Sequence, residues 1–419
     1  MTASEQGRAT TRTACPVDID LVDPDTFADG PPLQDFATIR EEEPVCWHPS
    51  PGSSGEGFWA VTTRADIEEV SRQPETFSSR EQGSILSASS HQQNETQMEV
   101  MRLLLLNMDP PEHSHLRNIV QRAFTPRTIR ALEPRLTEFA HQIVDRALQK
   151  QEGDFVKDVA AEMPLLALCE LAGIPGADRA KIFDLSNRLI GFDDPEFQTS
   201  PEDGAVASME MYMYANELAA EHQSNPRDDI ISRLLKAEID GGNLTVEQFD
   251  VFFLLLSVAG NETTRNAITH GMQAFFDHPE QWEIFKAERP LQSAAEEIIR
   301  WATPVMQFQR TAMRDYVLGG QRISKGERVA LFYTAANRDG TALPEPDRFD
   351  VRRQPNEHVA FGGGGPHFCL GANLARAEIR IMFDVIAERM PHVTRTGPPR
   401  ALRSMFINGI KELPVRYRT

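Results

Sequence analysis

The sequence predicts a mainly helical fold with a smaller β-rich lobe. Residues 128–240 form a succession of helical patterns. A capping box at Thr245–Gln248 then begins an apolar helix that continues to about Asp277. Aromatic and β-branched residues alternate at Gly57–Thr63, as is typical of a strand. At 1.5 Å per residue the long helix spans on the order of 50 Å, so we expect it to cross the centre of the fold.

The N-terminal part supplies the first strand and its flanking helices. Residues 1–20 are rich in small and polar side chains without an apolar core, so we expect a disordered N-terminus with no signal peptide and no membrane anchor. A single domain then covers residues 21–419, with short helices at 33–40 and 64–72. Residues 81–97 are polar and without a period, so they read as a long loop, either functional or simply solvated.

The middle and the C-terminal part complete the two lobes. Helical patterns cover 136–148, 163–171 and 180–189, and Met209, Met211 and Met213 follow on another helix. These methionines suit core packing or the adaptable lining of an apolar ligand site. Short strands at 317–322 and 328–333 and a closing hairpin at 402–411 extend the β-rich lobe.

The bulk composition narrows the class of protein. A net charge of −19 over 419 residues argues against a nucleic-acid partner, which requires a basic surface. The four cysteines show no CxxC spacing, so neither a zinc site nor a disulfide framework is implied, and a reducing cytoplasm fits. The apolar run at 251–260 is too short to span a bilayer.

One cysteine stands where a thiolate is useful. Cys369 lies between the glycine-rich run 362–365 and the start of an amphipathic helix. A helix N-terminus offers unpaired N–H groups that stabilise an anionic sulfur, and such a sulfur can bind iron. The glycines allow a close approach to a flat partner, and His367 can donate to an anion at its edge. An isolated cysteine is more often simply buried, but the ordered set of Phe361, glycines, His367 and Cys369 is unusual.

This segment resembles the cysteine-ligand loop of the cytochrome P450 family. The resemblance implies a haem b (iron protoporphyrin IX) with Cys369 as the axial ligand of its iron, and a P450 fold with the long helix over the haem. The spacing from Phe361 to Cys369 is eight residues, one more than is usual in the family. Motifs of the family occur in order from Asp23 to Tyr417.

Two donors one helical turn apart precede the helical region. His113 and Arg117 lie on one face of a helix that begins with prolines. The two side chains could bind a carboxylate together, or they could simply belong to a solvated basic face. The resemblance assigns this pair to a haem propionate and Arg310 to the second propionate.

Polar residues interrupt the apolar long helix at 260–264. Splitting a bound O–O bond requires protons, and the resemblance implies that Thr263 holds water and the oxygen species while Glu262 relays protons from solvent. These two residues are the predicted catalytic pair.

The resemblance also implies a buried ion-pair network. Glu297, Arg300 and Arg348 are expected to form a buried structural Glu–Arg–Arg set, although such an i,i+3 pair alone usually decorates a surface.

The expected partners follow from the same family. Residues 114–135 contain five arginines and a single acid, Glu133, and this basic cluster is either an ordinary charged face or a docking surface for the electron donor. No flavin or iron–sulfur segment is present, so a ferredoxin and its reductase would supply electrons for the use of O2 on a hydrophobic small molecule. We expect a monomer.

Several stretches are similar to bacterial enzymes that hydroxylate the terminal methyl of a cholesterol-type side chain, a subgroup that shares the eight-residue spacing. They include 259–266, 300–310 and 402–411. The alternatives are hydroxylation of a terpene, fatty acid or polyketide, a non-catalytic haem-binding protein, and a helical lipid carrier without haem. The residues expected to line the substrate pocket are Val258, Ala259, Val305, Phe308 and Phe406.

Overall fold

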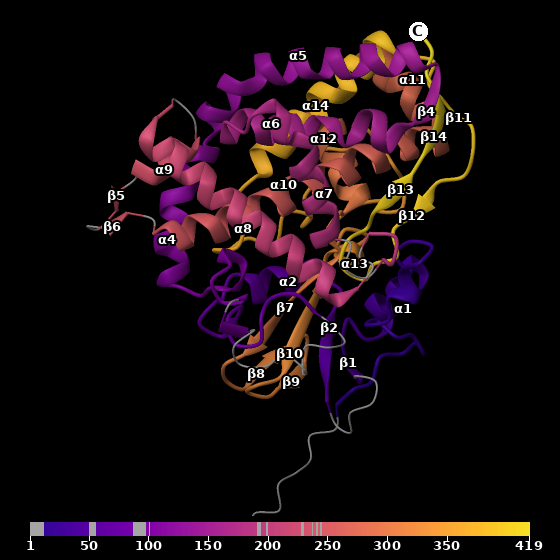
Figure 1. The fold of residues 1–419 in the computed structure, drawn as a ribbon. Coiled ribbons are helices and arrows are strands. Elements are labelled where there is room, and N and C mark those ends of the chain that lie inside the picture. Colours follow the sequence, from indigo (N-terminus) through magenta and orange to yellow (C-terminus); the bar gives the residue numbers. More distant parts are fainter. Residues whose placement is uncertain are drawn as a thin grey trace, which may run out of the picture.

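The computed structural model describes residues 12–49, 56–86, 98–99, 101–190, 194–197, 200–227, 230–236, 238–239, 242–243 and 245–419. Most of its helices gather in one large lobe, and the main sheet forms a smaller lobe at the opposite end with α1, α2 and α13 beside it (Figure 1). The α-helices are α1 (Leu33–Glu42), α2 (Arg64–Ser71), α4 (Glu112–Val120), α5 (Pro126–Lys150), α6 (Glu162–Ala172), α7 (Arg179–Ile190), α8 (Pro201–Ser224), α9 (Ile230–Lys236), α10 (Val246–Asp277), α11 (Pro279–Glu288), α12 (Leu291–Ala302), α13 (Tyr333–Ala336) and α14 (Ala372–Arg389).

The main sheet has the strand order β1-β2-β10-β7-β3. Strand β10 pairs parallel with β2 and antiparallel with β7, so segments far apart in the chain meet in one sheet. A smaller sheet has the order β11-β14-β4, and pairs β5-β6, β8-β9 and β12-β13 complete the set. The strands are β1 (Val45–Pro49), β2 (Gly57–Val61), β3 (Phe77–Ser78), β4 (Glu152–Asp154), β5 (Glu238–Ile239), β6 (Gly242–Asn243), β7 (Gln307–Ala312), β8 (Tyr316–Leu318), β9 (Gln321–Ile323), β10 (Arg328–Phe332), β11 (Thr394–Arg395), β12 (Arg400–Ala401), β13 (Ile410–Glu412) and β14 (Pro414–Arg416).

The long helix α10 is central, as predicted. The Thr245 side chain accepts from the Gln248 backbone and the Gln248 side chain accepts from the Thr245 backbone, which confirms the capping box. Helix α10 contacts α6, α7, α8, α11, α12 and α14. It remains α-helical through Gly260 and Thr263, so the polar interruption does not break the helix.

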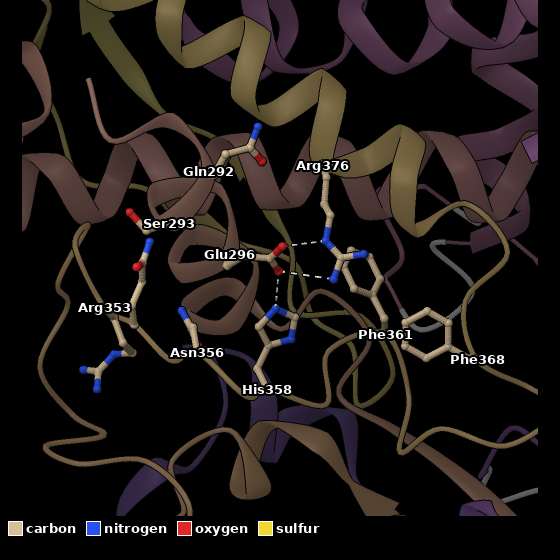
Figure 2. Close-up of a pocket in the computed structure, with 10 residues that line it drawn as sticks. Gln292, Ser293, Glu296, Arg353, Asn356, His358, Phe361, Phe368 and Arg376 are labelled. Atoms are coloured by element: carbon tan, nitrogen blue, oxygen red, sulfur yellow. Dashed lines mark hydrogen bonds and ion pairs between the residues drawn. The ribbon is translucent and has the colours of Figure 1, made fainter. Parts of the chain in front are cut away.

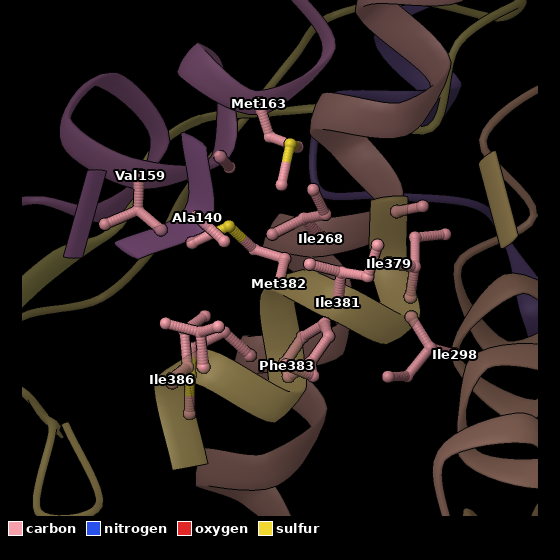
Figure 3. Close-up of a cluster of buried hydrophobic side chains, with 14 of the residues drawn as sticks. Ala140, Val159, Met163, Ile268, Ile298, Ile379, Ile381, Met382, Phe383 and Ile386 are labelled. Atoms are coloured by element: carbon pink, nitrogen blue, oxygen red, sulfur yellow. The ribbon is translucent and has the colours of Figure 1, made fainter. Parts of the chain in front are cut away.

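The helical core is continuous across α5, α10, α12 and α14. Ile268, Ile298, Met382 and Phe383 meet in it, and each is almost completely buried (Figure 3). Gly271 allows this contact, since an added Cβ would lie 2.7 Å from the Phe383 ring. The core therefore fixes α10 against α14, the two helices that carry the central motifs.

Two expectations for the N-terminal region are wrong. Residues 12–20 are not disordered, because Trp47 N donates to Thr13 O at 2.7 Å and Cys15 N donates to Trp47 O at 3.2 Å. Cys15 and Cys46 also form a disulfide, which the spacing of 31 residues did not indicate. Residues 1–11 lie outside the described residues, as do 87–97 of the predicted long loop.

The methionines of α8 divide between its two faces. Met211 is fully buried, whereas Met209 and Met213 are more than half exposed. In the described part of the chain, no helix combines the length and apolar character that a membrane span requires.

Candidate active site

The loop before α14 holds Cys369 at the start of that helix. Cys369 N donates to Phe361 O at 2.9 Å, which closes the loop. Burial raises the pKa of the Cys369 thiol, while N–H groups of Gly371 and Ala372 and the charge of Arg117 act in the opposite direction. The thiolate therefore needs a further positive partner, as a bound metal ion would supply.

The glycines of this loop are required by a neighbouring helix. A Cβ at Gly365, where φ is +69°, would lie 2.1 Å from the Ser71 carbonyl oxygen, and a Cβ at Gly363 would lie 2.6 Å from Ser71 Oγ. Gly363 and Gly365 therefore approach the C-terminal end of α2 closely, while the predicted approach of the glycines to a flat partner stays a prediction. That contact fixes the glycine loop between the sheet lobe and α14.

Residues of this loop line two cavities, and the chemistry of the lining distinguishes the two. They have similar volumes of about 280 and 310 Å³. The first is mainly apolar and contains Cys369 together with residues of α4, α10, β7 and α14. Its apolar lining outside the cysteine loop includes Leu105, Leu106, Phe124, Phe252, Leu255, Leu256, Ile299, Val305 and Phe308.

A cluster of cationic and imidazole groups stands in this apolar cavity. His113 and Arg117 come from α4, Arg310 from β7 and His367 from the cysteine loop, and all four line the cavity. The His113 and His367 rings lie 4.2 Å apart. Arg310 is buried, and its guanidinium donates to the adjacent carbonyl of Gln309, at 2.7 Å.

The environment of this cluster disfavours the charged form of its two imidazoles. Burial and the nearby arginines lower the pKa of His113 to about 4 and that of His367 to about 2. Neither ring nitrogen of the buried His113 has a hydrogen-bond partner within the described chain. Buried donors and charges of this kind are normally paired. Two carboxylates would fit here, so the cluster would suit the propionates of a haem whose iron Cys369 would bind.

Helix α10 presents Thr263, but not Glu262, to the same cavity. Ala259, Gly260, Thr263 and Thr264 line it, and Thr263 Oγ1 donates to Ala259 O at 2.6 Å. Glu262 is fully buried and forms an ion pair with Arg265, which in turn donates to Asn187 Oδ1 at 2.9 Å. Burial raises the Glu262 pKa, against the opposing effect of Arg265. The predicted pair is therefore divided between the cavity and the α7 side of the helix.

The buried ion-pair network contains a different arginine from the predicted one. Both Glu297 oxygens accept from Arg300 at 2.8 Å, and Arg353 Nε donates to Glu297 Oε2 at 3.1 Å. The Arg353 side chain is 8% exposed, whereas the Arg348 side chain is 56% exposed and pairs with Glu345. The prediction for Arg348 is wrong, because the backbone turns after Asp350 N binds Glu297 and brings Arg353 inward.

The second cavity lies beside the cysteine loop, and most of the residues that line it are polar or charged. In Figure 2, Glu296 stands at its centre and bonds both His358, at 2.9 Å, and Arg376, at 2.6 Å. Arg376 covers the Phe361 ring at 4.5 Å and lowers the Cys369 pKa through its charge. Glu296, His358 and Arg376 therefore support the cysteine loop through the contact of Arg376 with Phe361.

The predicted substrate-lining residues fall into two groups. Ala259, Val305 and Phe308 line the apolar cavity. Val258 and Phe406 are outside its described lining and pack in an adjacent apolar cluster with Val305 and Phe308. The prediction missed Phe252, Leu255 and Leu256, although their spacing before Ala259 and Thr263 marks one face of α10.

Comparison with known proteins identifies the family. The model of the Cytochrome P450 family matches residues 175–400. The chain is 48% identical to a steroid C26-monooxygenase of Rhodococcus jostii, over 99% of this chain and 88% of that protein. This chain belongs to the cytochrome P450 family.

Two further comparisons place the chain within the cytochrome P450 family. It is 41% identical to a methyl-branched lipid omega-hydroxylase of Mycobacterium tuberculosis, over 96% of this chain and 95% of that protein. A cytochrome P450 of Mycobacterium marinum in complex with pseudoionone superposes with a TM-score of 0.89 and 38% identity, covering 97% of this chain and all of the other. The chain is a P450 monooxygenase with a haem-thiolate cofactor.

Proposed function

We propose that this P450 hydroxylates a terminal methyl group of a steroid side chain of the cholestenone type. The observation that carries the proposal is the similarity to the steroid C26-monooxygenase over nearly the whole chain. A cavity lined by leucine, phenylalanine and valine side chains agrees with a large apolar substrate. The expected reaction is R–H + O2 + 2e⁻ + 2H⁺ giving R–OH + H2O.

The protein residues have separate tasks in this proposal. Cys369 would hold the haem iron, and His113, Arg117, Arg310 and His367 would hold the propionates. The bound haem supplies the oxygen activation, which the thiolate ligand promotes.

Thr263 is the hydroxyl that faces the reacting region. Its Oγ1 donates to Ala259 O in the described structure, so the lone pairs of the hydroxyl remain available to accept from water. Glu262 would relay protons toward Thr263 only after a change of its partner Arg265. The apolar side chains of the cavity would exclude bulk water while substrate is bound.

Electrons would come from a ferredoxin and its reductase. We call Arg122, Arg127 and Arg130 the arginine patch. These side chains are exposed, and none has an ion-pair partner among the described residues. The patch extends from the end of α4, where Arg117 donates to Phe368 O next to the cysteine, so a docked donor would lie on the thiolate side. Exposed arginines attract an acidic partner.

The first test is spectroscopic. The ferrous–CO difference spectrum of the haem-loaded protein is expected to show the thiolate-type Soret band, and cholest-4-en-3-one is expected to shift the ferric haem to high spin. Product analysis by mass spectrometry should then find a hydroxylated side-chain methyl. A thiolate band without a shift, or a product hydroxylated on the ring system, would contradict the steroid side-chain proposal.

A second substrate class has its own support. Similarity to the methyl-branched lipid omega-hydroxylase favours a branched fatty acid, which also presents a terminal methyl on an apolar chain. The same titration with a methyl-branched fatty acid separates the two. Tighter binding and faster turnover of the fatty acid would favour the lipid.

A further inference from the structure

A charged group lies beside the cysteine loop, in the second cavity. Glu296 of α12 accepts from Arg376 at 2.6 Å and from His358 at 2.9 Å (Figure 2). Among the described residues that line this cavity, Glu296 is the only carboxylate. The three side chains come from α12, from the segment before the cysteine loop and from α14, so the fold brings together polar groups that are distant in sequence.

This group carries one positive and one negative charge. His358 Nδ1 accepts from Ala360 N at 3.2 Å, so the hydrogen of the imidazole is on Nε2, where it is donated to Glu296. The histidine is therefore neutral in this arrangement, and the charge of Glu296 balances that of Arg376. The side chains of Arg376 and Glu296 are 30% and 28% exposed, so solvent screens the two charges only in part.

Arg376 lies next to the residue that is hydrogen-bonded to the cysteine. Its guanidinium carbon is 4.5 Å from the centroid of the Phe361 ring, and Phe361 O accepts from Cys369 N at 2.9 Å. Phe361 also lines both cavities. An aromatic ring and the surrounding protein screen a charge far less than water does, so the positive charge of Arg376 acts on the sulfur of Cys369.

We propose that Glu296 tunes the reduction potential of the haem by neutralising Arg376. A positive charge beside the thiolate ligand favours the ferrous state, because the added electron lowers the positive charge of the centre. Glu296 cancels this effect and thereby keeps electron density on the Cys369 sulfur. Glu296 acts on the haem only through Arg376, and this role is independent of which apolar substrate is bound.

The first experiment measures the reduction potential of the haem-loaded full chain without substrate. Spectroelectrochemical titration compares the parent with Glu296→Gln, which keeps the size of the side chain and removes its charge. At the potential where half of the parent haem is ferrous, the ratio of ferrous to ferric haem should be severalfold higher in E296Q and severalfold lower in Arg376→Met. The matched control is Asp384→Asn, which removes a more exposed carboxylate of α14 that pairs with Arg289 and should titrate like the parent. An E296Q variant that titrates like the parent would overturn the proposal.

The second experiment separates the effect of charge from the effect of packing. The double variant E296Q/R376M carries neither charge, so its two shifts should cancel and it should titrate close to the parent. Arg376→Lys keeps the positive charge without the flat guanidinium that covers Phe361, and it should remain closer to the parent than R376M. The comparison of R376K with R376M does not depend on the stability of E296Q. Shifts of both single variants in the same direction, or an R376K variant as displaced as R376M, would show that the group acts only through packing of the loop.

A vibrational measurement provides an independent readout of electron density at the iron. The ferrous–CO complex of each variant should keep the thiolate-type Soret band. Its C–O stretching frequency should rise in E296Q and fall in R376M, because a charge that draws electron density from the sulfur weakens donation from the iron to CO. Unchanged frequencies in both variants would contradict the proposal. No substrate enters either measurement, so failure of cholest-4-en-3-one would remove the steroid while leaving the role of Glu296 to be decided by the variants.

Discussion

Replacement of Arg353 should destabilise the protein far more than replacement of Arg348. In Arg353→Met, the fully buried Glu297 loses one of its two arginine partners and keeps Arg300, which binds both of its oxygens. Breaking a buried ion pair lowers the free energy of unfolding by about 3–5 kcal/mol. Because Arg300 still neutralises Glu297 in this variant, we expect a loss near the lower value, about 3 kcal/mol. Arg348→Met removes an exposed pair with Glu345 and should cost less than about 1 kcal/mol.

The expected shift in melting temperature follows from the length of the chain. Unfolding entropy is about 2.1 cal/mol/K per residue, so 419 residues give about 0.9 kcal/mol/K. A loss of about 3 kcal/mol in Arg353→Met then lowers Tm by about 3 °C, and Arg348→Met should lower it by less than about 1 °C. Circular dichroism of the haem-loaded variants at one scan rate provides the comparison. An Arg348 variant as unstable as the Arg353 variant would refute the assignment of Arg353 to the buried network.

Three further predictions concern proton delivery, the redox partner and acid stability. Thr263→Ala should keep the rate of electron consumption but lower hydroxylated product at least about tenfold in favour of peroxide, and an unchanged product yield would exclude the hydroxyl from proton delivery. Substitution of the arginine patch by glutamine should raise the ferredoxin concentration needed for half-maximal rate and weaken its dependence on salt, with the substrate-induced spin shift as the control that must not change. Burial lowers the pKa of His270 from 6.5 to about 4. As the pH drops from about 6.5 to 4, this histidine takes up a proton in the unfolded state but not in the folded state, so the free energy of unfolding should fall over that range. His270→Gln should flatten this loss by at most about 1.4 kcal/mol per pH unit in urea unfolding, while His392→Gln, at an exposed site, should not.

Local signals accounted for much of the fold. The capping box at Thr245, the strand at Gly57–Val61 and the glycine loop before Cys369 are encoded within short segments, because caps, strand alternation and turn glycines act over a few residues. The helices of the large lobe were likewise found near their predicted positions. The structure adds that the glycines make room for Ser71 of α2, a contact between residues almost 300 positions apart.

The candidate site was only partly accessible from the sequence. Cys369, Thr263 and the four propionate candidates lie in one cavity because their motifs occupy elements that the core holds together. Phe406 and Val258 are outside the described lining and pack in a cluster with two lining residues, because the position of a residue along an element does not fix the width of the cavity.

The sequence by itself predicted the chemistry: a cysteine placed before a helix N-terminus to bind iron, a hydroxyl on the central helix, and a basic patch on an acidic chain. Only the tertiary structure decided which arginine reaches Glu297, that Glu262 turns to Arg265, that Cys15 meets Cys46 and that Glu296 pairs with Arg376. The physical reason is common to all four. The partner of a side chain depends on which distant segments of the chain approach it. The sequence of a helix alone does not show which of its faces will meet which neighbour.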